Sequence, residues 1–438
     1  MVTEFIDRCK IQCLNGQTLD RSDIVRLLEI PVGSEDDRYL RAAAREVAAA
    51  LTGNRGYIWC AVGMDYAPCP MNCRFCSFGE AWNLIPQARH VTIEEILSHI
   101  RSFVAGGAAY IVLRTTEFYS LDTLLDYIPQ IRAAVPGEYA IILNTGELDS
   151  ITAQRAADAG VYGIYHALRL REGQDTPFRA ADRIATMQSV TQANMQLISL
   201  VEPIGPEHTP EELADRFLRT VACGASIGGA MARFPVPGTP LGDTRQLSDE
   251  EMAHIIAALR LSGGRTIRDI CIHPASPAAM ESGANVLVVE VGAIPRDATF
   301  SEQNWAGADM DQAAALLQNA GYTVSRPGKR LQSSRCPCVG SNLEKYLQPI
   351  LLHILSKEPC TGYTARKRIA DYATYRDSIP DMAATYRYLK VMASRGLLVC
   401  EDGVYRLSPE GSRCLDTWKQ TIRDYVQTLQ VLQQQFDE

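Results

Sequence analysis

Residues 69–76 read Cys69-Pro-Met-Asn-Cys73-Arg-Phe-Cys76 and place three thiols with three and then two residues between them. Cysteine thiolates hold iron–sulfur clusters, and a [4Fe–4S] cluster held entirely by protein needs a fourth thiolate. No further Cys completes a common ferredoxin or zinc spacing, so such a cluster would keep one iron open to another ligand. The alternatives are thiols buried as small apolar groups and a structural zinc site with a distant fourth ligand. Pro70, Asn72 and Arg74 suit an exposed loop, which favours the cluster.

Composition and charge are those of an ordinary globular protein. The chain has 438 residues, 46% of them hydrophobic and 21% charged, which is enough for two or three domains. Its net charge of −8 gives no general attraction to nucleic acid or to anionic membranes. The N-terminal residues lack the apolar segment of a signal peptide, the 13 Cys are unevenly spaced, and no long apolar run occurs. We therefore expect a cytoplasmic protein that does not cross a membrane.

Short apolar runs alternate with amphipathic helical runs from residue 57 onward. The strands expected are 57–62, 110–113, 139–143, 161–168, 196–201, 226–234, 267–273 and 286–291. Capping boxes that begin at Thr92, Thr209 and Ser248 open three of the intervening helices. Eight βα units fit a (β/α)8 barrel, for which about 250 residues is typical. Chemistry in such barrels gathers where the strands end, and the Cys loop directly follows the first expected strand.

The domain organisation follows from shifts in composition. We expect an N-terminal helical cap at 1–52, the barrel at 53–324, a linker at 325–342 and a further domain at 343–438. The linker is rich in Pro, Gly and Ser and contains Cys336-Pro-Cys338. These two thiols either bind a second cluster, with Cys360 as a further ligand, or are two thiols in a flexible segment.

The C-terminal domain is expected to be helical, with one small hairpin at 397–407 that turns at Asp402-Gly403. Residues 354–363, 385–389 and 405–411 resemble a winged helix of the PadR type, with a shortened wing. Apolar residues from Leu415 to Phe436 recur in steps of three and four, which is typical of a coiled coil. PadR-type proteins dimerise through a terminal helix, so a homodimer is expected; the alternative is one helix packed on its own domain.

The Cys loop, with the aromatic Phe75 before its third Cys, resembles the cluster loop of the radical S-adenosylmethionine (SAM) superfamily. The resemblance implies that Cys69, Cys73 and Cys76 bind three irons of a [4Fe–4S] cluster and that SAM chelates the fourth. An electron from a donor such as flavodoxin or ferredoxin would then cleave SAM to a 5′-deoxyadenosyl radical. That radical would abstract hydrogen from a small-molecule substrate inside the barrel.

Further cofactor residues are expected where the family binds SAM. The family's Gly-Gly-Glu segment after the second strand corresponds here to Thr115-Thr116-Glu117, which keeps only the carboxylate. Charged groups at the end of the fourth strand and in the next helix resemble those on the SAM carboxylate and ribose. The expected cofactor-binding residues are Phe75, Thr115, Thr116, Glu117, Arg169, Glu172 and Arg183. The alternative is that these charges form surface ion pairs.

Residues 178–187, 202–209 and 233–241 resemble the branch that contains biotin synthase, the [FeFe]-hydrogenase maturase, methylornithine synthase and the radical SAM protein of iron-guanylylpyridinol cofactor biosynthesis. Biotin synthase carries inner-strand Cys that this chain lacks at 143–146 and 197–200, so sulfur insertion by that route is not expected. Cys271 and His273, near the end of the seventh strand, are candidates for contact with the substrate. The alternative for Cys271 is a buried structural thiol.

Two functions from different classes remain open at this point. The first is a radical SAM enzyme that rearranges, cleaves or couples a small molecule in cofactor or natural-product biosynthesis. The second is an iron–sulfur or SAM-sensing transcription regulator that binds DNA through the winged helix. Arg387, Lys390 and Arg395 would face the DNA in the second case, although Asp377 and Asp381 dilute their charge.

Overall fold

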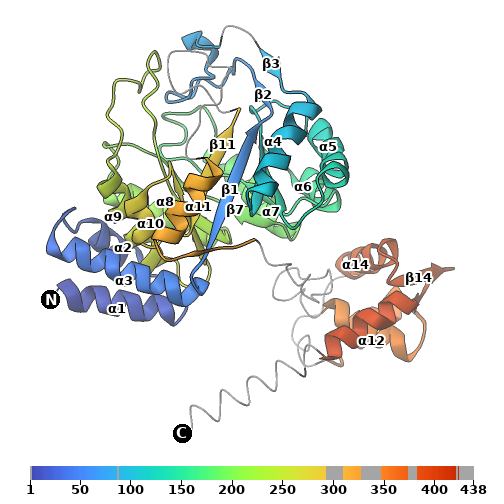
Figure 1. Ribbon diagram of the computed structural model, residues 1–438. Coiled ribbons are helices and arrows are strands. Elements are labelled where there is room, and N and C mark those ends of the chain that lie inside the picture. The colour runs from blue at the N-terminus through green and yellow to red at the C-terminus, as the bar shows by residue number, and fades with distance from the viewer. Residues whose placement is uncertain are drawn as a thin grey trace. The chain divides into compact units, whose positions relative to one another are not determined.

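The computed structural model describes residues 2–85, 88–292, 309–326, 347–372, 382–420 and 423. These residues form two compact units, one within residues 1–328 and the other within 329–438 (Figure 1). No described helix combines the length and the apolar character needed to cross a membrane.

The first unit is a closed barrel of parallel strands. Its strands are β1 (Arg55–Gly63), β4 (Tyr110–Arg114), β5 (Ala140–Asn144), β6 (Gly163–Tyr165), β7 (Gln196–Ile198), β8 (Val201–Ile204), β9 (Ile227–Ala232), β10 (Asp269–His273) and β11 (Val286–Val291). Each strand pairs with its neighbours in parallel, β7 and β8 together fill the fifth position, and β11 pairs with β1 to close the ring. The expected parallel barrel is therefore confirmed.

A helix follows each strand position and covers the outside of the barrel. The helices are α4 (Ile93–Ala105), α5 (Leu121–Ala134), α6 (Ser150–Asp158), α7 (Ala180–Gln192), α8 (Pro210–Ala222), α9 (Asp249–Ser262), α10 (Pro277–Glu281) and α11 (Met310–Asn319). The expected capping boxes at Thr92, Thr209 and Ser248 are formed, and each satisfies backbone N–H groups that a helix start leaves unpaired. These caps fix where each helix begins relative to the strand before it.

The strands bury side chains on both faces. In β1, Ile58 and Cys60 point outward into the core under the helices, whereas Trp59 and Ala61 point into the barrel. This alternation follows from the two-residue period of a strand. It explains why barrel strands read as continuous apolar runs, and it aims every second residue at the interior.

The strands at the fourth and fifth positions differ most from the apolar runs that predict them. The fourth covers only Gly163–Tyr165, and His166 and Ala167, which follow it, line a cavity at the rim. The run 196–201 divides into β7 and β8, and β8 is in irregular register with β9. Pro203 lies within β8, where its missing N–H removes one ladder bond.

Three N-terminal helices, α1 (Val2–Leu14), α2 (Arg21–Leu28) and α3 (Glu35–Thr52), pack beside α8 and α9 (Figure 1). The contact includes His254, whose Nδ1 lies 2.8 Å from Oδ1 of the buried Asp37. Since α3 ends just before β1 begins, these helices lie at the end of the barrel where strands start. The opposite end is left to the loops that carry the Cys.

The second unit contains α12 (Leu347–Lys357), β13 (Cys360–Thr361), α13 (Gly362–Ile369), α14 (Met382–Ser394), β14 (Leu398–Glu401) and β15 (Val404–Leu407). Its antiparallel sheet has the order β13-β15-β14, so the expected all-helical domain with one hairpin is corrected by a third strand. Its own core includes Leu351 and Leu389. Cys336, Cys338 and most of the apolar repeat between Leu415 and Phe436 lie outside the described residues.

Candidate active site

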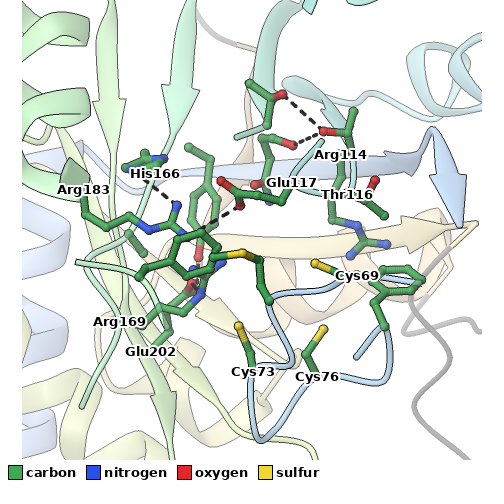
Figure 2. Close-up of a pocket in the computed structure, with 18 residues that line it drawn as sticks. Cys69, Cys73, Cys76, Arg114, Thr116, Glu117, His166, Arg169, Arg183 and Glu202 are labelled. Carbon is green, nitrogen blue, oxygen red and sulfur yellow. Dashed lines mark hydrogen bonds and ion pairs between the residues drawn. The ribbon is translucent and has the colours of Figure 1, made fainter. Parts of the chain in front are cut away.

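A cavity opens where the barrel strands end, and we call it the outer cavity. It encloses about 750 Å³, part of which is open to solvent. The residues that line it are Cys69, Met71, Cys73, Cys76, Phe78, Arg114, Thr115, Thr116, Glu117, Asn144, Thr145, Tyr165, His166, Ala167, Arg169, Phe178, Arg183 and Glu202 (Figure 2). The structure thus brings the three expected cluster ligands together with Thr115, Thr116, Glu117, Arg169 and Arg183.

The Cys loop follows β1 and turns its thiols toward this cavity (Figure 2). Its backbone is fixed by short hydrogen bonds, among them Cys76 N–H to the Cys73 carbonyl at 2.9 Å. Asn72 takes a left-handed conformation with φ of 47° and accepts the Ala81 N–H at 2.9 Å. The loop therefore presents its three sulfurs through its own hydrogen bonds.

Burial sets the acidity of two of these thiols. Burial raises the pKa of the Cys73 thiol to about 12 and also raises the pKa of Cys69. The nearby Arg169 guanidinium acts in the opposite direction on Cys73. Three grouped soft donors beside a cation fit a cluster with one iron left to a non-protein ligand.

Thr115, Thr116 and Glu117 begin the loop after β4. The Thr115 N–H donates to the Asn144 carbonyl at 2.9 Å, and the Thr116 N–H donates to Asp65 Oδ1 at 2.8 Å. Neither Thr has a positive φ, so this backbone does not require the glycines of the family pattern. Glu117 is only 16% exposed, and its Oε2 lies 3.6 Å from Arg183 Nη2.

Arg183, from α7, is almost completely buried beside the cavity. Its guanidinium lies 3.8 Å from the centre of the Phe178 ring, and its Nε lies 3.7 Å from Glu147 Oε1. Among the described residues, its Nε and Nη2 have no hydrogen-bond partner. Burial and the charge of Arg169 lower the pKa of Arg183. A buried cation with unused N–H groups is a site prepared for an anion.

Arg169 provides a second cation on the same wall. Its Nη1 is buried and finds no hydrogen-bond partner in the described part of the chain. Burial opposes its charge, but Glu202, with Oε1 at 3.9 Å from Arg169 Nε, helps to raise its pKa. The two arginines and Glu117 together offer donors for a carboxylate and an acceptor for an ammonium, so this wall fits the methionine part of SAM.

Glu172 and Phe75 do not line the outer cavity. Glu172 Oε2 accepts the Arg169 N–H at 2.7 Å, and its Oε1 accepts the Thr176 hydroxyl at 2.6 Å. Glu172 therefore shapes the loop that carries Arg169. Phe75 is half-buried between the second and third Cys of the loop.

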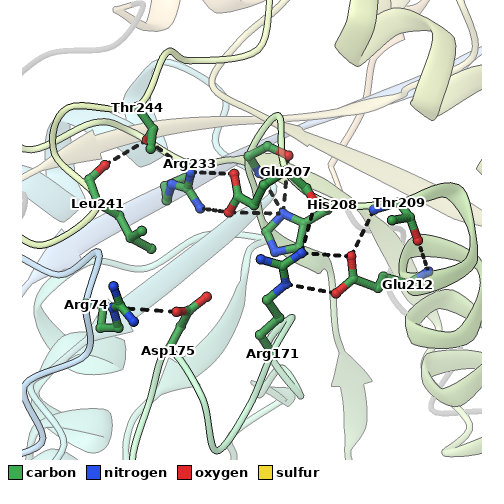
Figure 3. A network of polar contacts seen from close by, with 11 residues as sticks. Arg74, Arg171, Asp175, Glu207, His208, Thr209, Glu212, Arg233, Leu241 and Thr244 are labelled. Atoms are coloured by element: carbon green, nitrogen blue, oxygen red, sulfur yellow. Dashed lines mark hydrogen bonds and ion pairs between the residues drawn. The ribbon is translucent and has the colours of Figure 1, made fainter.

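A polar network ties the Cys loop to neighbouring loops on the rim (Figure 3). The Arg74 N–H donates to the Asp175 carbonyl at 2.9 Å, and the Arg74 carbonyl accepts the Leu241 N–H at 3.1 Å. Arg233, 3% exposed, pairs with both carboxylate oxygens of Glu207. The Cys loop is thus held from both sides by loops that follow β6 and β9.

A second cavity, which we call the inner cavity, lies inside the barrel and has a volume of about 440 Å³, part of which is open to solvent. It is lined by Trp59, Ala61, Val112, Arg114, Asn144, Tyr165, Leu200, Met231, Cys271, His273, Val288 and Glu290. The candidate residues Cys271 and His273 therefore lie here, and His273 Nε2 is 3.1 Å from Glu290 Oε1. Burial raises the pKa of Cys271 above its usual range. The two cavities share Arg114, Asn144 and Tyr165.

Sequence reasoning missed several polar residues of these cavities. Arg114 and Glu290 form an ion pair at 2.5 Å, and Tyr165 donates its hydroxyl to Glu202. Burial raises the pKa of the Glu202 carboxyl. The available signal was a charged residue inside or at the end of an apolar strand run, as for Glu290 in 286–291. Interior charges of this kind need partners on other strands.

Comparison with known proteins identifies relatives that cover about 70% of the chain. No protein-family model matches the chain. Biotin synthase 2 of Corynebacterium diphtheriae is 25% identical over 338 residues, covering 71% of this chain and 94% of that protein. The biotin synthase of Clostridium botulinum strain Hall is 24% identical over 337 residues, covering 73% of this chain and 99% of that protein.

Solved structures share the fold. Methylornithine synthase has a TM-score of 0.62 at 17% identity and covers 73% of this chain and 97% of its own. HydG, a maturase of the [FeFe]-hydrogenase, has a TM-score of 0.61 at 13% identity and covers 90% of this chain and 94% of its own. The relatives are radical SAM enzymes that use a [4Fe–4S] cluster and SAM, and the similarity indicates that this chain is an enzyme.

Proposed function

We propose that this enzyme binds its cluster and SAM in the outer cavity and abstracts hydrogen from a small molecule held inside the barrel. The product would belong to cofactor or natural-product biosynthesis, through a rearrangement, a C–C cleavage or a coupling. The observation that carries the proposal is the convergence of three thiols with the buried Arg183 and the half-buried Arg169, whose N–H groups are partly unused. The cluster, when bound, supplies the electron that cleaves SAM and starts the radical reaction.

The residues of the chain would divide the work of binding. Cys69, Cys73 and Cys76 would hold three irons, because thiolates are the ligands such clusters take. Arg169 and Arg183 would hold the SAM carboxylate through charge-assisted hydrogen bonds, and Glu117 would accept from its ammonium. The Thr115 and Thr116 backbone, fixed by Asn144 and Asp65, would keep that carboxylate in place.

The barrel itself would protect the reaction. A radical that can remove hydrogen from an unactivated carbon must be kept from solvent and from other C–H bonds. The apolar residues around the inner cavity and its direct junction with the outer cavity support this role. The segments 143–146 and 197–200 contain no Cys, which supports a reaction other than sulfur insertion.

The second unit supports a separate proposal about organisation. Its order of helix, strand, two helices and two strands, with a three-stranded antiparallel sheet, supports the proposal of a winged helix. We propose the boundaries 1–52, 53–324, 325–342 and 343–438 for cap, barrel, linker and winged helix. We also propose that the apolar repeat after residue 411 forms a homodimer.

Electron paramagnetic resonance of the reduced, anaerobically reconstituted full chain tests SAM binding at the cluster. If SAM occupies the open iron, its addition changes the g-values of the reduced cluster. S-adenosylhomocysteine, which keeps the amino and carboxylate groups but lacks the sulfonium charge, serves as a comparison ligand. A [4Fe–4S] signal that neither compound alters would contradict the proposal.

A further inference from the structure

The inner cavity has a distinctive distribution of polarity. Every strand position of the barrel contributes to it, with Leu200 coming from the link between β7 and β8. The inward side chains nearer the rim include Arg114, Asn144, His273 and Glu290. On β4, β10 and β11, the side chains two positions earlier are Val112, Cys271 and Val288, and they also point inward. Trp59 lies at the same depth on β1. The cavity therefore has a polar entrance next to the outer cavity and a deeper, mostly apolar part.

Arg114 and Asn144 are neighbours in this polar layer. They are Cα partners in the parallel pairing of β4 with β5. Arg114 Nη1 donates to Glu290 Oε2 at 2.5 Å, whereas Arg114 Nη2 is buried without a hydrogen-bond partner among the described residues. The Asn144 carboxamide likewise has no hydrogen-bond partner in the described part of the chain. Leaving a buried N–H unpaired costs roughly 1–3 kcal/mol, so a ligand that accepts from it is favoured.

We propose that the inner cavity binds a small carboxylic acid as substrate, with its carboxylate on Arg114 and Asn144 and its hydrocarbon part in the deeper layer. This inference rests on the proposed function, because it names the substrate class for that reaction. Two adjacent oxygens in one plane match a guanidinium N–H and a neighbouring amide N–H. The hydrocarbon part would pack against Trp59, Val112, Leu200 and Val288.

Other charged ligands fit this layer less well. An ammonium group needs an acceptor, and both carboxylate oxygens of Glu290 already face Arg114 or His273. A phosphate would bring about two negative charges to a guanidinium whose charge Glu290 already balances. A carboxylate adds one charge and takes the donors that are left. The carbon chain would then begin where the two cavities meet, beside Tyr165.

Calorimetric titration of the full chain, with cluster and SAM bound, tests the proposal with straight-chain acids from butanoate to octanoate and their primary amides. The acids should bind about tenfold more tightly than the matching amides, because an amide lacks the negative charge of the carboxylate. Affinity should also rise about two- to fourfold per added CH₂ until the cavity is filled.

Three variants locate the effect. Arg114→Lys keeps a cation for Glu290 but loses the second N–H, and Asn144→Ala removes a side chain that no described residue uses; each should weaken hexanoate binding about tenfold. Arg101→Gln, on the exposed face of α4, is the matched control and should leave the affinity for hexanoate unchanged. Asn144→Ala keeps the test valid if Arg114→Lys does not fold.

Two results would overturn the inference. One is that none of the acids binds more tightly than its amide. The other is that Asn144→Ala binds hexanoate as the wild type does. The proposed function is tested separately in the same samples, by the change that SAM causes in the electron paramagnetic resonance signal of the wild type. Acid binding without that change would refute the proposed function and leave the carboxylate site intact.

Discussion

Arg183 illustrates how individual residues prepare the outer cavity for an anion. Its side chain is 2% exposed, yet Nε and Nη2 have no hydrogen-bond partner among the described residues. Stacking on Phe178 and the nearby Glu117 and Glu147 offset part of the cost of burying its charge. The remaining cost is repaid when an anion binds.

We expect Arg183→Gln to weaken SAM binding by about tenfold, roughly 1.4 kcal/mol, because a charge-assisted contact to the SAM carboxylate is lost. Arg179→Gln on the same helix is the control, since Arg179 is 80% exposed and pairs only with Asp182 in the described structure. Equilibrium dialysis with labelled SAM on the reconstituted full chain measures both. Equal dissociation constants for wild type and Arg183→Gln would contradict the assigned role.

Glu207 carries a pH-dependent contribution to stability. Its hydrogen bonds to Arg233 lower the pKa of Glu207 to about 2 from the usual 4.5. Because the folded-state pKa lies below the unfolded one, the stabilisation is present above pH 4.5 and is lost as the pH falls toward 2. We expect Glu207→Gln to lower the free energy of unfolding by about 2 kcal/mol at pH 7.

Urea unfolding between pH 7 and pH 3.5 checks this expectation. The difference between wild type and Glu207→Gln should shrink as the pH falls below about 4.5. Glu94→Gln is the control, because Glu94 is exposed and has no ion-pair partner among the described residues. A difference that stays constant over this range would show that the Arg233 contact does not set the acidity of Glu207.

Residue spacing predicts only part of the candidate site. Sequence reasoning grouped the three Cys with Glu117, Arg169 and Arg183, and all six line the outer cavity. The prediction worked because strand ends in a parallel barrel meet at one rim. Arg114 and Glu290 were missed, since their pairing depends on which strands become neighbours when the barrel closes.

At the scale of elements, the approach of β1 to β11 limits what the end of β1 can carry. A Cβ built on Gly63 would lie 1.7 Å from the Gly292 carbonyl oxygen. Since the loop with the Cys follows directly, the position of Gly63 also determines where that loop starts. The absence of a side chain here is a packing requirement.

We expect Gly63→Ala to lower the free energy of unfolding by about 3 kcal/mol, because backbone atoms must move to admit the methyl group. Gly53→Ala, at the C-cap of α3, is the comparison. There φ is 60° and no atom lies near the new Cβ, so backbone strain alone should cost about 1–2 kcal/mol. Denaturant unfolding separates the two, and equal losses would contradict the packing argument.

Helix starts are more predictable than strand ends in this chain. The capping boxes at Thr92, Thr209 and Ser248 lie where sequence reasoning put them, because the signal is local. The fourth strand ends early and the fifth is interrupted, since apolar composition does not separate a paired strand from a buried segment at the rim. Ala167 and Leu200 are apolar for the second reason, as each lines a cavity.

At the scale of the whole molecule, alternating apolar runs and helices were enough to predict a parallel barrel. Both faces of its strands are buried, which produces the continuous apolar runs in the sequence. The smaller unit was predicted less well, because β13 has two residues and leaves no recognisable run. Leu415, the first position of the apolar repeat, packs into that unit's own core.

The remaining positions of the repeat lead us to expect a homodimer. Replacing Leu429 and Leu432 by Lys together would place charges in the seam and convert dimer to monomer, because buried unpaired charges are costly. Sedimentation velocity of the full chain measures this. Replacing Gln427 and Gln430 by Lys, which are polar positions of the same segment, is the control. A monomeric wild type would contradict the expectation.

The most direct test of the account is the formation of 5′-deoxyadenosine by the anaerobically reconstituted full chain with SAM and dithionite. The account predicts this product for the wild type. Cys73→Ala should lose both the product and most of the cluster iron, whereas Cys223→Ala, in a half-buried thiol at the end of α8, should retain both. No product from the wild type, or undiminished product from Cys73→Ala, would contradict the central claim.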